Sequence, residues 1–486
     1  MNNFELAKQY FIDGLRLTNN EEYQNAESKF MSSLEVIPDR VSTLTNLAAT
    51  QIKLKKYPDA MENAKKALFF DPVNVEANLN LGIIECELKN FSKAIDFFNV
   101  AIDLMPTSCE GWLNKGNALQ NLNQHYEALV CFSKAIEIKP NLAEAWVSKG
   151  LTFLELNNCL DSKAAFEKAI SLDPNYKNAR YCMAFVQLLT GNYREGWKNY
   201  EFRSKQKNEG SKVAATAMLQ SLKKIEYKNI YIFCDQFFGD SIQFSRYIKK
   251  LNNLNANIYI EVDKPLKDLF QNSFLNCIIL NPDTKIPLID YQVPISSLPF
   301  LFDENFYESS SCISYLRCTS QAKLAWNKKL NLSKTKLNIA LACSGNIDHF
   351  KHDKNRPIRL ELFKPLLDLA DIYLVQKSIQ SEDEKFLFDH SNIKFLGNEI
   401  ESFDDTAAII ERMDLVISID TSIAHLSGAL GKKTWVLVSC APDWRWMLDR
   451  DDSPWYPSIK LYRQKNFNDW EGVLQEVMTD LRSIAR

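Results

Sequence analysis

The first 176 residues repeat one pattern of small, large apolar and polar positions every 34 residues. Small residues let two helices cross at close range and a proline stops a helix, so each period predicts two antiparallel helices. Large aromatic residues between the small ones would fill the space between neighbouring helices. The prolines are Pro38, Pro72, Pro106, Pro140 and Pro174, and the small columns are Gly14, Ala48, Gly82, Gly116, Gly150 and Ala184; Ala26, Ala60, Ala94, Ala128 and Ser162; and Ser33, Ala67, Ala101, Ala135 and Ala169.

Five complete periods fall within residues 7–176, and a weaker sixth follows them. A helix is predicted over 177–190, and the stretch from Gly191 to Arg203 has the spacing of an incomplete closing repeat. A stack of such helix pairs is a solenoid in which each repeat contacts only its neighbours. We therefore predict an all-α solenoid over residues 1–203.

From residue 229 the pattern changes to short apolar runs separated by segments with helical spacing. Such alternation predicts parallel, doubly wound α/β sheets. The runs at 230–234, 257–262, 277–280 and 291–298 predict the strands of one lobe, with a helix at 241–251. The runs at 337–342, 372–375, 393–396, 415–419 and 434–438 predict a second lobe, with helices at 405–412 and 422–430 among others.

Domain limits follow from these changes of pattern. The polar, lysine-rich segment before the first strand predicts a linker with a short helix over 204–226. The first α/β lobe is then expected at 227–330 and the second at 331–486. The length of 486 residues fits several domains, because a single hydrophobic core rarely supports so long a chain.

Composition narrows the class of protein further. The net charge of −3 argues against a nucleic-acid partner. The N-terminus lacks the features of a signal peptide, and no apolar stretch is long enough for a transmembrane segment. Eleven scattered cysteines without a Cys-x-x-Cys pair favour a reducing compartment, so we expect a cytoplasmic protein. Five dispersed histidines predict no metal site.

The repeat columns resemble the tetratricopeptide repeat (TPR), whose stacks form a curved surface that usually holds a peptide or protein. One polar column, Asn46, Asn80 and Asn114, occupies the position that faces the concave side in TPR stacks. O-GlcNAc transferases with TPR repeats use a similar asparagine ladder to hold protein substrates. The alternative is a solvated polar face. TPR stacks often self-associate, so a homo-oligomer is a further expectation.

One strand-to-helix junction in the second lobe is suited to an anion. The predicted strand ends at Asp420, and a helix begins at Thr421 and Ser422. Free N–H groups and positive potential at a helix N-terminus suit a diphosphate, and His425 lies one turn into that helix. The alternative is an ordinary helix cap with a buried structural histidine.

Other polar residues follow predicted strands. Gly239 and Asp240 lie in the turn after the first strand, where Asp240 could be a general base or an N-cap. After strand 337–342 come Gly345, Asn346 and Arg356, the last a candidate phosphate ligand or part of a basic surface loop. Gln376 ends another strand. Thr406 lies at a helix start and could be a site residue or part of a plain cap.

These motifs resemble glycosyltransferase family 9, the ADP-heptose:lipopolysaccharide heptosyltransferases, which carry a similar Asp-Thr-x-x-x-His-Leu-x-x-Ala-Leu-Gly segment. The runs 442–446, 452–457 and 461–464, and the Gly-Trp-x-x-Tyr-Glu-x-Arg junction at 196–203, are similar to bacterial TPR–glycosyltransferase fusions. The resemblance implies a GT-B fold of two Rossmann-like lobes. It implies a nucleotide-sugar donor held by Gly239, Gly345, Asn346, Arg356, Gln376, Thr406, Asp420, Thr421, Ser422 and His425.

The family resemblance also implies the reaction. An inverting, metal-independent enzyme would use Asp240 as the base, with the nucleotide sugar as co-substrate and no further cofactor. The repeats would recruit the acceptor, which could be a protein. The alternative is a non-catalytic TPR scaffold, or a sugar-nucleotide sensor that assembles partner proteins.

Overall fold

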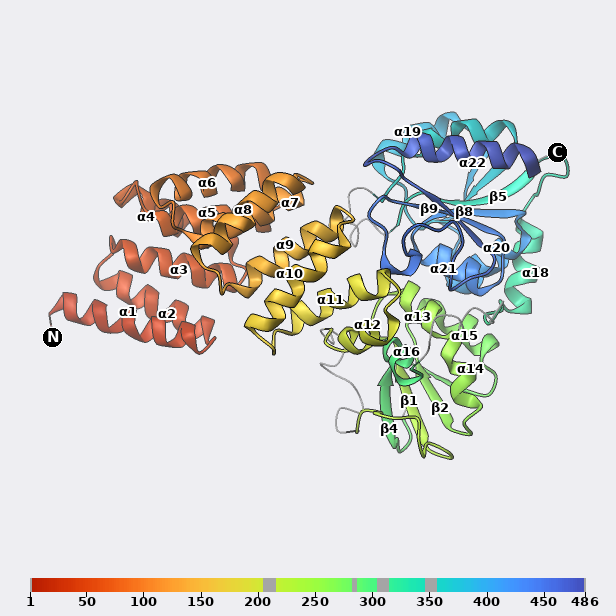
Figure 1. Ribbon diagram of the computed structural model, residues 1–486, viewed down its shortest axis with the longest axis horizontal. Coiled ribbons are helices and arrows are strands. Elements are labelled where there is room, and N and C mark those ends of the chain that lie inside the picture. Colours follow the sequence, from red (N-terminus) through yellow and green to blue (C-terminus); the bar gives the residue numbers. More distant parts are fainter. Residues whose placement is uncertain (1, 204–215, 282–285, 304–313, 346–355, 485–486) are drawn as a thin grey trace. The chain divides into compact units, whose positions relative to one another are not determined.

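The computed structural model describes residues 2–203, 216–281, 286–303, 314–345 and 356–484 (Figure 1). The chain divides into two compact units, Met1–Ala179 and Arg180–Arg486. The first is all helical, and the second contains both sheets.

The first unit is a stack of five helix pairs. From the second pair on, the first helix begins every 34 residues, at Val41, Val75, Cys109 and Ala143. This register confirms the predicted repeats. The pairs are α1 (Asn3–Asn19) with α2 (Tyr23–Val36), α3 (Val41–Lys53) with α4 (Tyr57–Phe70), α5 (Val75–Glu87) with α6 (Phe91–Leu104), α7 (Cys109–Asn121) with α8 (His125–Ile138), and α9 (Ala143–Glu155) with α10 (Cys159–Leu172).

The first column of small residues exists because an aromatic ring packs onto it. A Cβ atom placed on Gly116 would lie 2.5 Å from Cε1 of Phe132, and the same relation holds in three other repeats. The second repeat has Ala48 and Ala64 at these two positions, and both are fully buried. A larger residue on one helix is thus matched by a smaller one on the other. The other three pairs are Gly14 with Phe30, Gly82 with Phe98, and Gly150 with Phe166.

Each turn between the two helices of a pair contains one residue in the left-handed region. These residues have φ values between 58° and 64°, and none is a glycine. Side chains with a Cβ atom adopt this conformation at a cost of about 1–2 kcal/mol, least for asparagine. They are Glu21, Lys55, Lys89, Asn123 and Asn157.

The sixth helix pair is α11 (Lys177–Leu189) and α12 (Tyr193–Tyr200), and from Arg180 on it belongs to the second unit. Trp197 packs edge-on against Trp444 and Trp455, with ring centroids 5.2 Å and 6.3 Å away. The buried Arg203 side chain pairs with Asp235 at 2.9 Å. These contacts join the closing repeat, which the prediction placed in the solenoid domain of residues 1–203, to the α/β region.

The first lobe contains a parallel sheet of four strands in the order β3-β2-β1-β4. Met218 pairs with Gln292 of β4, and the described part of the predicted linker, 216–226, contains no helix. The helix expected at 241–251 is two short helices that begin earlier, at Phe238. The elements are β1 (Asn229–Phe233), α13 (Phe238–Phe244), α14 (Arg246–Asn252), β2 (Asn257–Glu261), α15 (Lys267–Ser273), β3 (Ile278–Leu280), β4 (Tyr291–Pro294) and α16 (Leu298–Leu301).

The second lobe contains a parallel sheet of six strands in the order β10-β9-β8-β5-β6-β7. Helices cover both of its faces, with α19 and α22 on one side and α20 and α21 on the other (Figure 1). The elements are β5 (Leu337–Ala342), β6 (Ala370–Leu374), α19 (Ser381–Asp389), β7 (Ile393–Phe395), α20 (Phe403–Arg412), β8 (Leu415–Ile419), α21 (Ser422–Ala429), β9 (Thr434–Val438), β10 (Ile459–Arg463) and α22 (Trp470–Ile484).

Residues 320–329, which fall within the predicted first lobe, form helix α18 (Ser320–Lys329), and this helix contacts α20 of the second lobe. Thr319 donates to Asp404 at 2.6 Å, and the Trp326 indole donates to Asp405 at 2.8 Å. These hydrogen bonds hold α18 against the second lobe. Within the described residues, no helix combines the length and apolar character that a bilayer span requires.

Candidate functional site

The two lobes contact each other where their central strands end. Helix α13 follows β1, and helix α21 follows β8. A Cβ atom on Gly239 of α13 would lie 3.0 Å from Cδ2 of His425 on α21, so these helices pack closely. Ligands of open parallel sheets bind outside the carboxyl ends of the strands, and two such ends meet here. The space that glycine leaves at position 239 is filled by His425.

Arg445 connects the lobes at this junction. It lies in a short turn after β9, and its guanidinium stacks 4.2 Å above the Trp444 ring. One end of the guanidinium donates to Asp443 at 2.8 Å. The other edge faces α13, where Nε donates to Gln243 at 2.7 Å and a terminal nitrogen pairs with Asp240. A buried cation therefore joins two carboxylates from different lobes.

Asp240 lies in the first turn of α13, three residues after the capping position. One carboxylate oxygen pairs with Arg445, and the other accepts from the Phe237 N–H at 3.2 Å. Burial raises the pKa of Asp240, and the charge of Arg445 opposes part of that rise. The side chain therefore stabilises the helix end and also lies at the lobe junction. Both interpretations of this residue are compatible with its position.

Asp420 and Arg356 form a second ion pair beside this one, with 3.3 Å between Oδ2 and the guanidinium. Burial raises the pKa of Asp420, and Arg356 opposes that rise. Burial alone would raise the pKa of Asp443 too, but Arg445 and Arg356 outweigh it and the pKa is lowered. Arg356, which was predicted as a candidate phosphate ligand, thus pairs with a carboxylate of its own lobe.

His425 is neutral, and its ring contacts Tyr456, Trp446 and Asp420. Its Nδ1 lies 3.0 Å from the Tyr456 hydroxyl, and its ring stacks on Trp446 with centroids 5.5 Å apart. Nε2 lies 3.9 Å from Asp420. Burial, followed by the charge of Arg445, lowers the pKa of His425 to about 3. A neutral imidazole donates one hydrogen bond and accepts another but adds no positive charge for a phosphate.

Thr421 and Ser422 begin α21 as the sequence predicted. The Thr421 hydroxyl accepts from the Ile423 N–H at 3.2 Å, so it acts as the helix cap. Ser422 is the first helical residue and is partly exposed. The predicted diphosphate position at this helix start is flanked by Gly239, whose Cβ position would lie 3.8 Å from Cα of Ser422.

Other predicted residues lie apart from these ion pairs. The Gln376 amide accepts from the N–H groups of Cys343 and Ser344 at 2.9 and 3.2 Å, so it braces the turn after β5. Thr406 donates to the Ser402 carbonyl at 3.2 Å within the first turn of α20. Gly345 is partly buried at the end of that β5 turn. Asn346 lies outside the described residues.

The three asparagines of the solenoid differ from one another. Asn80 is 8% exposed, and its amide donates to the Thr45 carbonyl of the preceding repeat at 2.9 Å. Asn46 donates to Ser42 of its own helix at 2.8 Å, and Asn114 is half-buried. Asn80 therefore links two repeats, and the three amides do not form a uniform ladder that is open to a ligand.

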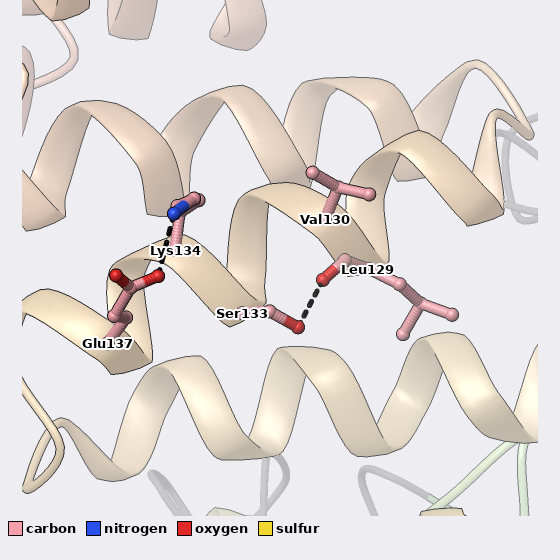
Figure 2. A pocket seen from close by; sticks show the side chains of 5 residues that line it. All are labelled: Leu129, Val130, Ser133, Lys134 and Glu137. Carbon is pink, nitrogen blue, oxygen red and sulfur yellow. Dashed lines mark hydrogen bonds and ion pairs between the residues drawn. The ribbon is translucent and has the colours of Figure 1, made fainter.

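A shallow depression lies elsewhere on the solenoid, along α8. It measures about 270 Å³, and Lys134 and Glu137 pair across its edge at 2.7 Å (Figure 2). One helix lines it, and it contains neither the asparagines nor the junction residues. The lining residues are Leu129, Val130, Ser133, Lys134 and Glu137.

Asp443, Arg445 and Gln243, which connect the two lobes at the junction, had no predicted role. One signal was present, because Asp443 and Arg445 alternate with tryptophans a few residues after a buried strand. The closing repeat was also missed as a neighbour of the site. The ring of Tyr181 on α11 lies 5.5 Å from that of Tyr200, which in turn lies 6.4 Å from the Trp444 ring beside Arg445.

Two models of the tetratricopeptide repeat match residues 109–142 and 143–176, one repeat each, which confirms the prediction of TPR repeats. Protein FlbA of Caulobacter vibrioides is 22% identical over 349 residues, covering 63% of this chain and 55% of FlbA. The chain thus spans little more than half the length of that relative.

Solved structures of TPR proteins are among those similar to this chain. A thermophilic TPR protein of Thermus thermophilus has a TM-score of 0.35 and 20% identity, covering 37% of this chain and 99% of its own. YrrB, described as a TPR protein with an unusual peptide-binding site, has a TM-score of 0.29 and 22% identity, with coverage of 35% and 88%. A TPR protein from Parabacteroides merdae has a TM-score of 0.34 and 18% identity, with coverage of 40% and 78%.

Proposed function

We propose that this TPR protein is a glycosyltransferase of GT-B architecture. It moves a sugar from a nucleotide-activated donor to an acceptor hydroxyl, and the solenoid recruits the acceptor, which we take to be a protein. The proposal rests on one observation. Helices α13 and α21, which follow the central strands of the two lobes, meet at Gly239 and His425. The buried Asp240 of the first lobe lies there with Arg356 and Arg445 of the second.

The proposed reaction is a single displacement with inversion. Asp240 takes the proton of the acceptor hydroxyl, whose oxygen attacks the anomeric carbon of the donor. A new carbon–oxygen bond forms while the bond to the phosphate oxygen breaks, and the leaving group keeps its electron pair. Arg356 and the N-terminus of α21 stabilise the charge that develops on the leaving phosphate. The raised pKa of Asp240 suits a base that must also release its proton.

Turnover of nucleotide sugars tests this assignment. The full chain is incubated with ADP-, UDP-, GDP- and CMP-linked sugars, and release of the nucleotide is measured with water as the acceptor. We expect turnover of at least one donor class, and a loss of about 10²–10⁴-fold in Asp240→Asn, because a general base typically contributes that much. Asp268→Asn, an exposed carboxylate on α15 of the same lobe, should leave turnover unchanged.

The results separate the proposal from its rival. Unchanged turnover in Asp240→Asn would remove the base assignment. If no donor class is turned over but one raises the melting temperature of the native chain, the protein is a sugar-nucleotide sensor. Neither turnover nor binding would leave the TPR scaffold as the function.

A further inference from the structure

The two sides of the Arg445 guanidinium contact different lobes. Asp443 and the Trp444 ring fix one side within the second lobe, at 2.8 Å and 4.2 Å. The opposite edge, made of Nε and a terminal nitrogen, reaches Gln243 and Asp240 on α13 of the first lobe. An arginine edge with two parallel N–H donors is the geometry that binds carboxylate or phosphate bidentately.

The first lobe therefore occupies the phosphate-matching edge of Arg445 with oxygen atoms of its own. Asp240 supplies a carboxylate oxygen and Gln243 an amide oxygen, both side by side on one helix face. Arg356, the neighbouring cation, is likewise engaged with Asp420 at 3.3 Å. A diphosphate that arrives at this junction would meet cations that already have carboxylate partners, so binding requires an exchange of partners.

Resting on the proposed function, we propose that Arg445 exchanges Asp240 for the diphosphate of the donor. Without donor, Arg445 neutralises the base and docks α13 on the second lobe. When a diphosphate binds, the Nε edge of Arg445 turns to its oxygens, while Asp443 keeps the guanidinium in place. Asp240 is then free to accept the proton of the acceptor hydroxyl, so the base becomes available only after the donor is bound.

The exchange has a consequence that a simple binding role would not produce. Asp240 and the diphosphate compete for the same edge of Arg445, so removing the negative charge of Asp240 should tighten anion binding. An ordinary substrate-binding or structural residue would weaken binding or leave it unchanged when mutated. The asparagine variant keeps the size and an oxygen acceptor for the Phe237 N–H.

Calorimetric titration of the full chain with inorganic pyrophosphate tests the exchange. We expect Asp240→Asn to bind pyrophosphate about ten-fold more tightly than the native chain, and Arg445→Gln to bind it at least ten-fold more weakly. Asp268→Asn on α15 is the matched control and should bind like the native chain. If Arg445→Gln fails to fold, as judged by its thermal melt, Asp240→Asn decides the question alone.

The outcomes of the titration separate the exchange from the proposed function. Equal or weaker binding by Asp240→Asn overturns the exchange and leaves the proposed function standing. If neither the native chain nor Asp240→Asn binds pyrophosphate or any of the four classes of nucleotide sugar, the proposed function fails as well.

Discussion

At the scale of single residues, the glycine–phenylalanine pairs set what the solenoid tolerates. Glycine is normally poor in a helix, by about 1 kcal/mol relative to alanine. At Gly116 this rule is reversed, because a Cβ atom would lie 2.5 Å from the buried Phe132 ring. The ring, not the backbone, requires glycine at this position.

We therefore expect Gly116→Ala to lower the free energy of unfolding by about 1 kcal/mol or more, since overpacking costs about 1–3 kcal/mol and outweighs helix propensity. In a chain that already carries Phe132→Ala, the same change should instead be stabilising, because the pair then matches Ala48 and Ala64. Urea unfolding followed by far-ultraviolet circular dichroism measures both effects. The same sign in both backgrounds would contradict the ring as the cause.

His425 leads to a prediction on pH. Its pKa is lowered to about 3 in the folded chain, from 6.5. The unfolded state therefore binds more protons between these values, and stability falls as the pH drops below 6.5. With about 1.4 kcal/mol per pKa unit, the native chain should lose about 2 kcal/mol more than His425→Gln between pH 7 and pH 5.

Tryptophan fluorescence during urea unfolding reports this loss, because only Trp112 and Trp146 of the nine tryptophans lie outside the second unit. Identical losses in the native chain and in His425→Gln would show that the histidine is not held neutral by burial.

At the scale of elements, sequence patterns succeeded where one spacing was repeated. Five helix pairs and nine strands were predicted because columns of small residues and buried apolar runs are patterns that extend over many positions. The predictions failed at the ends of helices and at the edge strand of a sheet. Helix α13 begins at Phe238 because the Asp240 side chain accepts from the Phe237 N–H, and β10 was missed because Lys460 interrupts its apolar run.

The turns between paired helices offer another prediction. Lys89 has a φ of 64°, where a side chain costs about 1–2 kcal/mol and glycine costs nothing. Lys89→Gly should therefore raise the free energy of unfolding by about 1 kcal/mol, as measured in urea. Asn123→Gly, at the equivalent turn, should change it far less because asparagine tolerates this conformation. An equal gain at both positions would contradict this account.

At the scale of the whole molecule, the candidate site was only partly visible in the sequence. Asp240, Asp420 and His425 were predicted because they follow strands, and the structure brings them to one junction. Arg445 and Gln243 could not be paired in advance, because they are 202 residues apart and meet only through the packing of two lobes. Local patterns contain no information about such contacts.

The contacts of the closing repeat lead to a truncation experiment. A fragment of residues 177–486 should melt cooperatively, whereas 204–486 should melt at a lower temperature or aggregate. The shorter fragment lacks Trp197, which covers Trp444 and Trp455, and leaves Asp235 without Arg203. Removing one partner of a buried ion pair alone costs about 3–5 kcal/mol. Similar melting of both fragments would place the closing repeat with the solenoid after all.

The constant interval between helix starts at Val41, Val75, Cys109 and Ala143 also bears on how such genes change. An unequal crossover that removes or duplicates 34 codons keeps the reading frame and joins equivalent helices to equivalent neighbours. Deletion of residues 75–108, for instance, brings Cys109 to the place of Val75. Descendants of this gene can thus differ by whole repeats in the reach of the solenoid, while the two parallel sheets are inherited unaltered.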